Sequence, residues 1–600
     1  MTGGIVAHAC LLIGATPSPL PPVTNVDPVA AEAVDIAPEA PTDRVRPGIR
    51  ARQFDALVVQ VNPGAVRAPP PEAFPQDSLP VPDRYRLADN LGIKVNRFDP
   101  YHQNDLKGDR PVKGTTDCFV ALTGISDTVV EPRSFPIPVG VQTTERPGSL
   151  DVFGRDNAFV FSQTLLFGGS IFKGATAFKP PEIELRGIFA YNVTYAQVEE
   201  RRILSVLPAR GPHRLSSFFG VQELFLDYHL RNVSARYDFD SIRVGIQPFS
   251  SDFRGFLFQD NQLGVRIFGN RDDNRFQYNL AFFDRLEKDT NSGLNDIRQT
   301  PRDDQILIAN LYRQDLPVPG FTSQITIVYN RNHERGLHLD ANGFPVRPAL
   351  LGDLRPRTYD VVYPGYSGDG HFGRVNLTTS IYGAFGEDRN SIFTQRPTRI
   401  AAFFAAAEAS YDIDYLRVRV SGLFASGDNN PYDNKETGFD AIAENPLFAG
   451  ADTSYWIRQS IPFAGGGRAI AINNRNGVLN DLRSSKDEGQ SNFQNPGTIL
   501  AGIGVDADLT TQFRVTGNVN HLWFATTEVL EALRQQARIG HDIGWDLSVA
   551  TIYRPKFTQN IVVRASLAGL VPANGFKQLF TNQARDSLYY SALLNITLSY

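Results

Sequence analysis

The stretch Glu182–Tyr195, EIELRGIFAYNVTY, alternates between apolar and polar residues with a period of two. Side chains of a β-strand point alternately to opposite sides, which gives this period. The stretch therefore predicts a strand with one apolar and one polar face. The apolar face carries Ile183, Leu185, Phe189, Tyr191, Val193 and Tyr195, and the polar face carries Glu184, Arg186, Asn192 and Thr194.

The length of this stretch favours a membrane. A strand of a soluble sheet is typically about 5 to 6 residues long, whereas a tilted strand that crosses a bilayer needs about 9 to 11. About seventeen alternating segments follow one another from Thr115 to Tyr600, and bacterial outer-membrane barrels have an even strand number. The sequence therefore predicts an all-β fold, a transmembrane antiparallel β-barrel of about 16 to 18 strands with long extracellular loops.

The last stretch, Leu588–Tyr600 (LYYSALLNITLSY), repeats the alternation. Tyr590, Leu594 and Leu598 share one face, and Asn595 lies on the other. A free strand edge in lipid would leave backbone groups unpaired at several kcal/mol each. We therefore expect this strand to close the barrel against the first strands. Its final aromatic residue is similar to the C-terminal signature of bacterial outer-membrane barrels.

Composition excludes two other classes of protein. Of the 600 residues, 42% are hydrophobic and 20% charged, and no apolar run reaches the roughly 18 residues of a membrane-spanning helix. The formal net charge of -5 argues against a strongly basic surface for nucleic acid. Cys10 and Cys118 form no zinc-binding pattern, and the sequence leaves open whether they pair.

The chain divides by composition near residue 82. Residues 1–82 are rich in Pro and Ala, which predicts a periplasmic or signal-derived segment, with strand character only at Ala56–Asn62. The start has a short apolar run but no basic residues before it, which makes it a poor signal peptide. Residues 83–600 are predicted to form the barrel. Tyr411–Tyr415 is a short turn between two strong strands.

Three longer inserts are expected at the outer end of the barrel. The Gly427–Pro496 insert is far longer than the roughly 12 to 15 residues at which a structureless loop becomes unusual. We expect it to pack on itself or to fold into the pore. Arg285–Asp304 and Arg331–Gly370 are predicted to lie on the same side, and the spacing of Thr526–Ile539 predicts a short helix there.

Arginine dominates the predicted inner face of the barrel. The chain has 10 Lys and 49 Arg, and an Arg on the lipid face would cost about 2 to 4 kcal/mol at mid-membrane. Arginines that alternate with apolar residues should therefore point inward. The predicted pore-lining cations are Arg186, Arg243, Arg266, Arg374, Arg417, Arg419, Arg514 and Arg564. The carboxylates predicted on the same faces are Glu223, Asp227, Asp506, Asp508 and Asp546.

Two interpretations of this wall follow. Rows of fixed positive charge would favour anions, because guanidinium groups suit carboxylates and phosphates. Alternatively, the carboxylates neutralise the arginines, and the ion pairs stiffen the wall without selecting a solute. The alternation of residues does not determine which charges are neighbours.

Signals for catalysis or metal binding are weak. His333 and His338 are five residues apart, not the four of a zinc-binding helix, and Asp428–Asp440 lacks the spacing of an EF-hand. His229 and His521 are the only histidines near predicted strands that merit inspection. We therefore predict no enzyme, metal or cofactor. The aromatic residues predicted to form interfacial girdles are Tyr195, Tyr312, Tyr329, Trp523, Phe524 and Tyr553.

Four parts of the chain resemble known outer-membrane proteins. His521–Phe576 is similar to the closing strands of the alginate-export-like outer-membrane porins, with polar strands followed by a glycine-rich one. Asp83–Asn90, Asp99–Val112 and Ser426–Gly450 resemble segments of uncharacterised Gram-negative outer-membrane proteins. The resemblance implies a barrel with long loops and specifies neither a substrate nor a binding residue.

The sequence as a whole predicts a porin of the bacterial outer membrane. We expect a channel for passive diffusion of small solutes or saccharides, with a preference for anions as a further expectation. Membrane lipid and lipopolysaccharide are expected partners, and a protein partner at the outer loops or the N-terminal segment is left open. The alternatives are a plugged barrel with a structural or docking role, and an outer-membrane enzyme.

Overall fold

The computed structural model describes residues 84–134, 155–174, 180–234, 238–347, 355–450, 453–458, 461–462, 469–470, 489–555, 560–579 and 587–600. Contacts divide the chain into two units, Met1–Lys94 and Val95–Tyr600. In the first unit the described residues include the helix α2 (Arg84–Asn90). The expected strand at Ala56–Asn62 and the residue Cys10 lie outside the described residues.

The second unit is a barrel of long strands. Its strands are β1 (Cys118–Ser134), β2 (Asn157–Lys173), β3 (Ile183–Val198), β4 (His213–Asn232), β5 (Phe239–Ser250), β6 (Gln259–Arg271), β7 (Phe276–Asp284), β8 (Asp304–Arg313), β9 (Phe321–Asn332), β10 (Tyr359–Phe372), β11 (Val375–Asp388), β12 (Thr398–Ile413), β13 (Leu416–Ala425), β17 (Thr498–Asp508), β18 (Phe513–Trp523), β19 (Asp542–Tyr553), β20 (Ile561–Pro572) and β21 (Tyr589–Ser599). Short pieces lie between β13 and β17: β14 (Lys435–Glu436), α3 (Tyr455–Arg458), β15 (Ile461–Pro462) and β16 (Ala469–Ile470).

The sheet closes on itself. Each barrel strand pairs antiparallel with the next, β13 pairs with β17, and β21 pairs with β1 through partners such as Ile125 and Ser599. Within the described residues this gives an 18-stranded closed antiparallel barrel, with β14 added in parallel beside β12. The predicted fold, its even strand number and its closure by the last strand are confirmed.

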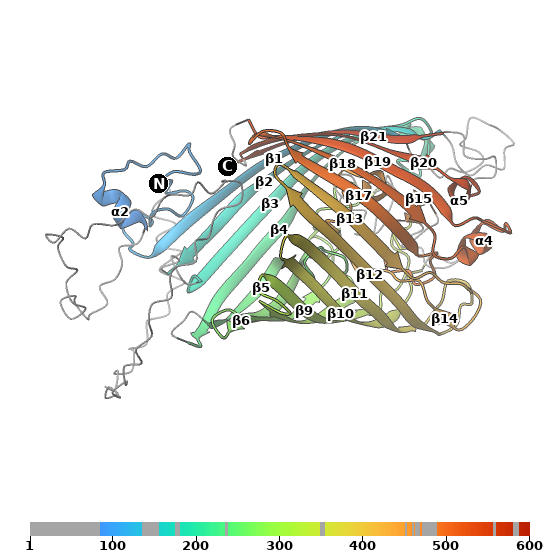
Figure 1. Cartoon of the computed structure of the whole chain (residues 1–600), viewed down its shortest axis with the longest axis horizontal. Helices are drawn as coiled ribbons and strands as arrows, with labels where there is room; N and C mark the ends of the chain where they lie inside the picture. The colour runs from blue at the N-terminus through green and yellow to red at the C-terminus, as the bar shows by residue number, and fades with distance from the viewer. Residues whose placement is uncertain are drawn as a thin grey trace, which may run out of the picture. The chain divides into compact units, whose positions relative to one another are not determined.

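The strands run obliquely around the barrel (Figure 1) and are 9 to 20 residues long. The strand β3 shows why the sequence folds this way. Leu185 and Tyr191 are exposed on its outer face, whereas Ile188, Asn192 and Thr194 are buried on the inner face. The alternation in the sequence is therefore the alternation between the outside and the inside of the barrel.

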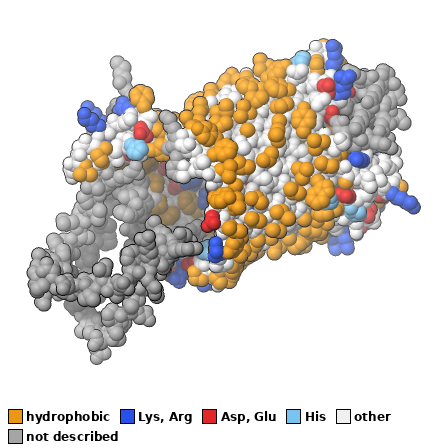
Figure 2. Space-filling model, turned by 45° about the horizontal axis from the view of Figure 1, so that its top comes forward, with side chains coloured by type: hydrophobic (Ala, Val, Ile, Leu, Met, Phe, Trp, Pro, Cys, Tyr) orange, Lys and Arg blue, Asp and Glu red, His pale blue; other side chains and the backbone are white. Residues whose placement is uncertain are grey.

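The outer surface carries a broad apolar band. Leu226, Val265, Leu307, Ile327 and Phe385, on β4, β6, β8, β9 and β11, are between 40% and 54% exposed. Figure 2 shows the band around the visible wall, with charged side chains gathered toward its edge. Burying this band in a bilayer removes apolar area from water, and a closed barrel leaves no strand edge unpaired in lipid. The chain is a membrane-spanning β-barrel of the bacterial outer-membrane type.

Connections at the two ends of the barrel differ in length. At one end the turns are short, for example residues 373–374, 414–415 and 509–512. At the other end they include residues 285–303, 333–358 and 426–497. Both β1 and β21 meet the short-turn end, because the strand number is even.

One strand was hidden in a predicted insert. The segment Arg331–Gly370, predicted to be a loop, contains β10. Pro364, Gly365 and Gly368 interrupt its alternation in the sequence. Its register with β9 is nevertheless continuous, and its register with β11 lacks only the pairs of Tyr363 and Pro364.

Helices are short within the described part of the chain. The helix predicted in Thr526–Ile539 is present as α4 (Glu528–Arg534), in the connection between β18 and β19. The helix α5 (Asn574–Lys577) follows β20. No described helix is long and apolar enough to cross a membrane.

Candidate functional site

Twelve of the thirteen residues predicted to line a pore lie on barrel strands, on the side opposite the exposed apolar residues. On β13, for example, Val420 and Phe424 are exposed outside, whereas Arg417 and Arg419 share the face of the buried Ser421 and Leu423. The others on lumen faces are Arg186, Glu223, Asp227, Arg243, Arg266, Asp506, Asp508, Arg514, Asp546 and Arg564.

Arg374 is placed differently from the prediction. It lies in the turn between β10 and β11 and is exposed. Its guanidinium group donates to the carbonyl oxygen of Asp412 at 3.1 Å and lies over the ring of Tyr411. The two-residue turn interrupts the alternation at this point, so the assignment of Arg374 to the inner face was wrong.

Most of the lumen arginines have a carboxylate partner. Arg186 bonds Glu223 at 2.6 Å, and Arg243 bonds Asp227 at 2.7 Å. Arg419 lies 3.0 Å from Asp506. The remaining two pairs are Arg514 with Asp508 at 2.6 Å and Arg417 with Asp412 at 2.5 Å. Five arginines of the wall are therefore neutralised by neighbours.

Two of the partners were missed in the sequence. Asp412 lies at the end of β12 and forms a two-pronged contact with Arg417. Glu408, also on β12, is buried, accepts a bond from Ser421 and lies 4.0 Å from Arg419. The alternation along β12 places both on the inner face, so the same signal would have found them.

Arg266 differs from these five. Its Nε donates to the amide oxygen of Asn279 at 2.7 Å, and its guanidinium group lies over the rings of Phe268 and Phe249. Among the described residues no carboxylate lies within ion-pair distance of it. The nearest strand neighbour in register is another arginine, Arg243.

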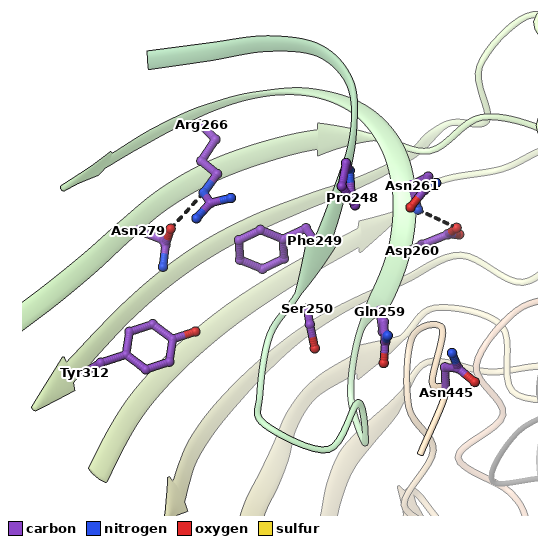
Figure 3. Close-up of a pocket in the computed structure, with 10 residues that line it drawn as sticks. All are labelled: Pro248, Phe249, Ser250, Gln259, Asp260, Asn261, Arg266, Asn279, Tyr312 and Asn445. Atoms are coloured by element: carbon purple, nitrogen blue, oxygen red, sulfur yellow. Dashed lines mark hydrogen bonds between the residues drawn. The ribbon is translucent and has the colours of Figure 1, made fainter. Parts of the chain in front are cut away.

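Arg266 lines a cavity of about 350 Å³ in the lumen (Figure 3). Arg266, Asn279, Tyr312 and Phe249 form one side, and Gln259 and Asn445 lie on the other. Tyr312 was predicted to belong to an outer girdle, but it points inward. Its hydroxyl group bonds to the amide of Asn310 on the inner face of β8.

One connection that narrows the lumen is residues 251–258, between β5 and β6. The carboxylate of Asp252 accepts the backbone N–H groups of four residues, 254 to 257, at 2.6 to 3.1 Å, and the hydroxyl of Tyr382 on β11 at 3.0 Å. The backbone oxygen of Ser251 accepts from Gln324 on β9. A buried carboxylate with several backbone donors fixes the shape of this connection.

The described part of the long connection 426–497 also folds into the barrel, which is one of the two arrangements that the sequence left open for Gly427–Pro496. Ala443 bonds through its backbone to Gln259 at 2.8 Å and to Leu257 at 3.2 Å. Phe448 packs on Phe256 with ring centroids 5.3 Å apart. Farther along the chain, Asp546 accepts the backbone N–H of Tyr455 at 3.0 Å.

The inward connections and the wall share one apolar cluster. Phe439, Phe448, Tyr455 and Trp456 of the long connection are at most 7% exposed and belong to the same cluster as Phe404 of the wall. Inward-facing apolar residues of the strands are thereby covered by protein. The described part of the connection is therefore a packed element and not a free loop.

Further connections are held by buried ion pairs. Arg302 bonds Glu334 at 2.6 Å, and Arg285 bonds Asp304 at 2.7 Å. All four side chains are at most 5% exposed. The first pair joins residues 285–303 to residues 333–347 at the long-connection end, and the second links the two ends of the connection 285–303.

Predicted candidates for other chemistry are not assembled into a site. His229 bonds Asn232, and His521 lies outside the barrel between Trp523 and Trp545. His333 contacts Arg331 and Asp360. The described residues contain no group of three or more His, Cys, Asp or Glu able to hold a metal ion, and this includes the acidic run at Asp428.

No family model and no curated protein matches the chain. The fold is similar to solved structures that cover 80% of this chain: OccAB3 of Acinetobacter baumannii (TM-score 0.42, 10% identity, 99% of that chain), OccK5 (OpdH) of Pseudomonas aeruginosa (0.41, 9%, 98%), and the outer-membrane protein OpdK of Pseudomonas aeruginosa (0.37, 10%, 98%). The resemblance to the alginate-export-like family stays a prediction.

Proposed function

We propose that the protein is an outer-membrane channel for passive diffusion of small solutes, whose width is set by inward-folded connections. The observation that carries this proposal is a polar, charged inner face on a closed barrel of 18 strands. Barrels of this size normally enclose an aqueous path unless a loop fills it. By the usual orientation of such barrels, the long connections face the outside of the cell.

The proposed selectivity element is Arg266. The five paired arginines contribute little field, because each charge is balanced within 3.0 Å. Arg266 faces a cavity and has only an amide and two rings around it. A guanidinium group in this setting attracts carboxylates or phosphates. We therefore propose a preference for anionic solutes, among them charged saccharides, that depends on this one residue.

Single-channel conductance in a planar bilayer, with reversal potential under a salt gradient, tests both parts. We expect small, stable open steps with anion preference. Arg266→Gln should shift the reversal potential toward zero. The matched control is the double variant Arg186→Gln, Glu223→Gln, which removes a pair without changing the net charge and should leave the reversal potential unchanged. Equal shifts in both would contradict the assignment to Arg266.

The apolar packing of the long connection favours a second candidate, a barrel closed by its own loop. Phe448 and Trp456 are buried against the wall, as a plug would be. A barrel that inserts but stays silent would support this candidate. Asn520→Ala with Asp546→Ala would then remove two anchors of the loop, at Ala449 and Tyr455, and opening events should follow.

A further inference from the structure

A row of charged residues crosses the outer wall of the barrel. Side chains directly opposite each other on adjacent strands form the sequence Gln305, Arg331, Asp360, Glu387, Arg399 and Lys435. These strands are β8 to β12 and β14. All six alternate with buried residues, for example Asp304, Asn332 and Ile400, so they point outward.

The row lies at the edge of the apolar band, at the long-connection end. A second row, of apolar and aromatic residues, lies on the same outer face of β8 to β12, two positions nearer the middle of each strand. Its members pair in the same register: Leu307, Tyr329, Val362, Phe385 and Ala401. Two residues along a strand span about 7 Å. The charged row is therefore at the depth where hydrocarbon gives way to lipid headgroups.

Cations outnumber carboxylates here. Arg331, Arg399 and Lys435 lie in the row, and Arg389 follows directly after β11, so four cations stand against Asp360 and Glu387. The carboxylate of Asp360 is already occupied, because it accepts from Tyr329 at 2.8 Å and from Arg389 at 3.0 Å.

His333 connects two members of the row. Arg331 can only donate, so the Nδ1 of His333 must accept from it, at 3.2 Å, and Nε2–H then donates to Asp360 at 3.0 Å. Arg331 also donates to Gln305 at 3.0 Å. These bonds hold the guanidinium group at the surface without neutralising it, because both acceptors are uncharged. Among the described residues, no carboxylate lies within ion-pair distance of Arg331, Arg399 or Lys435.

Outward-facing arginines near the short-turn end of the barrel are arranged differently. Arg231 and Arg271 both bond the carboxylate of Asp240 at 2.8 Å. Arg313, at the same end of β8, lies over the ring of Phe276. The row at the long-connection end differs from both cases because Arg331, Arg399 and Lys435 lie in one register across adjacent strands.

We propose that this row binds the phosphate groups of an anionic lipid in the leaflet that surrounds the long-connection end. Arginine recognises phosphate with paired hydrogen bonds, and each cation near a charged membrane surface contributes about 1 kcal/mol. The apolar row directly below holds the acyl chains of the same lipid. The site lies outside the barrel and does not depend on whether the lumen conducts.

The test is a calorimetric measurement of the affinity of bisphosphorylated lipid A for the full-length protein in uncharged detergent micelles. We expect Arg331→Gln with Arg399→Gln to weaken binding about 25-fold, at about 5-fold for each cation. Arg313→Gln, at the short-turn end of the outer wall, is the matched control and should leave the affinity unchanged. Equal weakening in the control, or none in the double variant, would overturn the site.

A variant that gains affinity guards against misfolding as an explanation. Glu387→Gln removes a carboxylate from the row and should tighten lipid binding about 5-fold, and a tighter complex cannot result from a disordered protein. Two further arms identify the ligand. Dephosphorylated lipid A should bind at least 10-fold more weakly, whereas sodium phosphate at the same concentration should not compete. Competition by free phosphate would overturn the assignment to a lipid.

Discussion

Arg419 on β13 and Arg266 on β6 both extend from the barrel wall into the lumen, but their surroundings differ. Arg419 meets Asp506 at 3.0 Å, Asn518 at 2.8 Å and Glu408 at 4.0 Å. Arg266 meets an amide and two rings. An arginine with a carboxylate partner stiffens the wall, whereas an arginine without one is available to a solute. The role of a lumen arginine therefore depends on whether it has a carboxylate partner and not on its residue type.

The largest effect is expected where the pairing is most deeply buried. Glu334 is 5% exposed and bonds Arg302, whose side chain is fully buried. Glu334→Ala should leave the buried Arg302 with only Asp304, which lies 3.8 Å away and already bonds Arg285, and should destabilise the barrel by about 3 to 5 kcal/mol. Urea unfolding in lipid vesicles measures this. Glu387→Ala, an exposed carboxylate on the outer wall, is the control and should change stability by less than about 1 kcal/mol.

The reverse case, buried carboxylates without a cation partner, predicts a pH dependence. Burial raises the pKa of Asp428 to about 7, with Asp433 and Glu528 adding to it. Burial likewise raises the pKa of Glu436 to about 8; Asp388 and Asp428 add to the shift, and Arg357 opposes it. One oxygen of each carboxyl group has no hydrogen-bond partner among the described residues.

The sign of this dependence follows from the direction of the shifts. Both folded pKa values lie above the ordinary carboxyl value of about 4, so the folded state keeps protons that the unfolded state loses. The stability contribution is full below about pH 4 and is lost as pH rises through about 7 to 8. Resistance of the 426–450 segment to proteolysis should therefore fall between pH 6 and pH 9. Glu436→Gln should flatten that profile, and an unchanged profile would contradict the protonated state.

An effect of intermediate size is expected when a substitution removes the carboxylate partner of a lumen arginine. Asp506→Asn removes the closest carboxylate of Arg419 and should cost about 1 to 2 kcal/mol. It should also increase the anion preference of the channel, because Arg419 is then available to a solute. Reversal potentials compare this variant with Asp508→Asn, which frees the more exposed Arg514 and should shift selectivity less. An equal response from the two would show that burial does not matter.

The sequence was sufficient to predict most strands and the inner or outer face on which most of their residues lie, because both follow from a period of two. It failed where other forces overrode that period. Pro364 and the glycines of β10 hid a strand, although its neighbours pair with it. Tyr312 shares a face with Ile306 and Ile308, which point inward because the inward connections cover them. An apolar inner face of this kind cannot be recognised before the connections are placed.

The sequence could not predict which charged residues form ion pairs, and the reason is different. Arg419 and Asp506 are separated by 87 positions, and they meet because β13 and β17 pair with Arg419 opposite Gly504. A shift of that register by two residues, so that Arg419 lay opposite Gly502, would leave both side chains on the inner face and yet move them apart. The same holds for Arg266, whose lack of a partner depends on the register of β6 with β5 and β7.

The smallest effect is expected for the most exposed pair. Arg417 and Asp412 are about half exposed, at 49% and 50%, near the short-turn end. Water screens such a pair, so Arg417→Gln should change stability by no more than about 1 kcal/mol despite the 2.5 Å contact. The double variant Arg417→Gln, Asp412→Asn should also leave the reversal potential within error, since it removes a neutral pair without changing the net charge of the lumen. A shift as large as that of Arg266→Gln would show that an exposed partner does not neutralise an arginine in this lumen, and the distinction between paired and unpaired residues would then have to rest on burial alone.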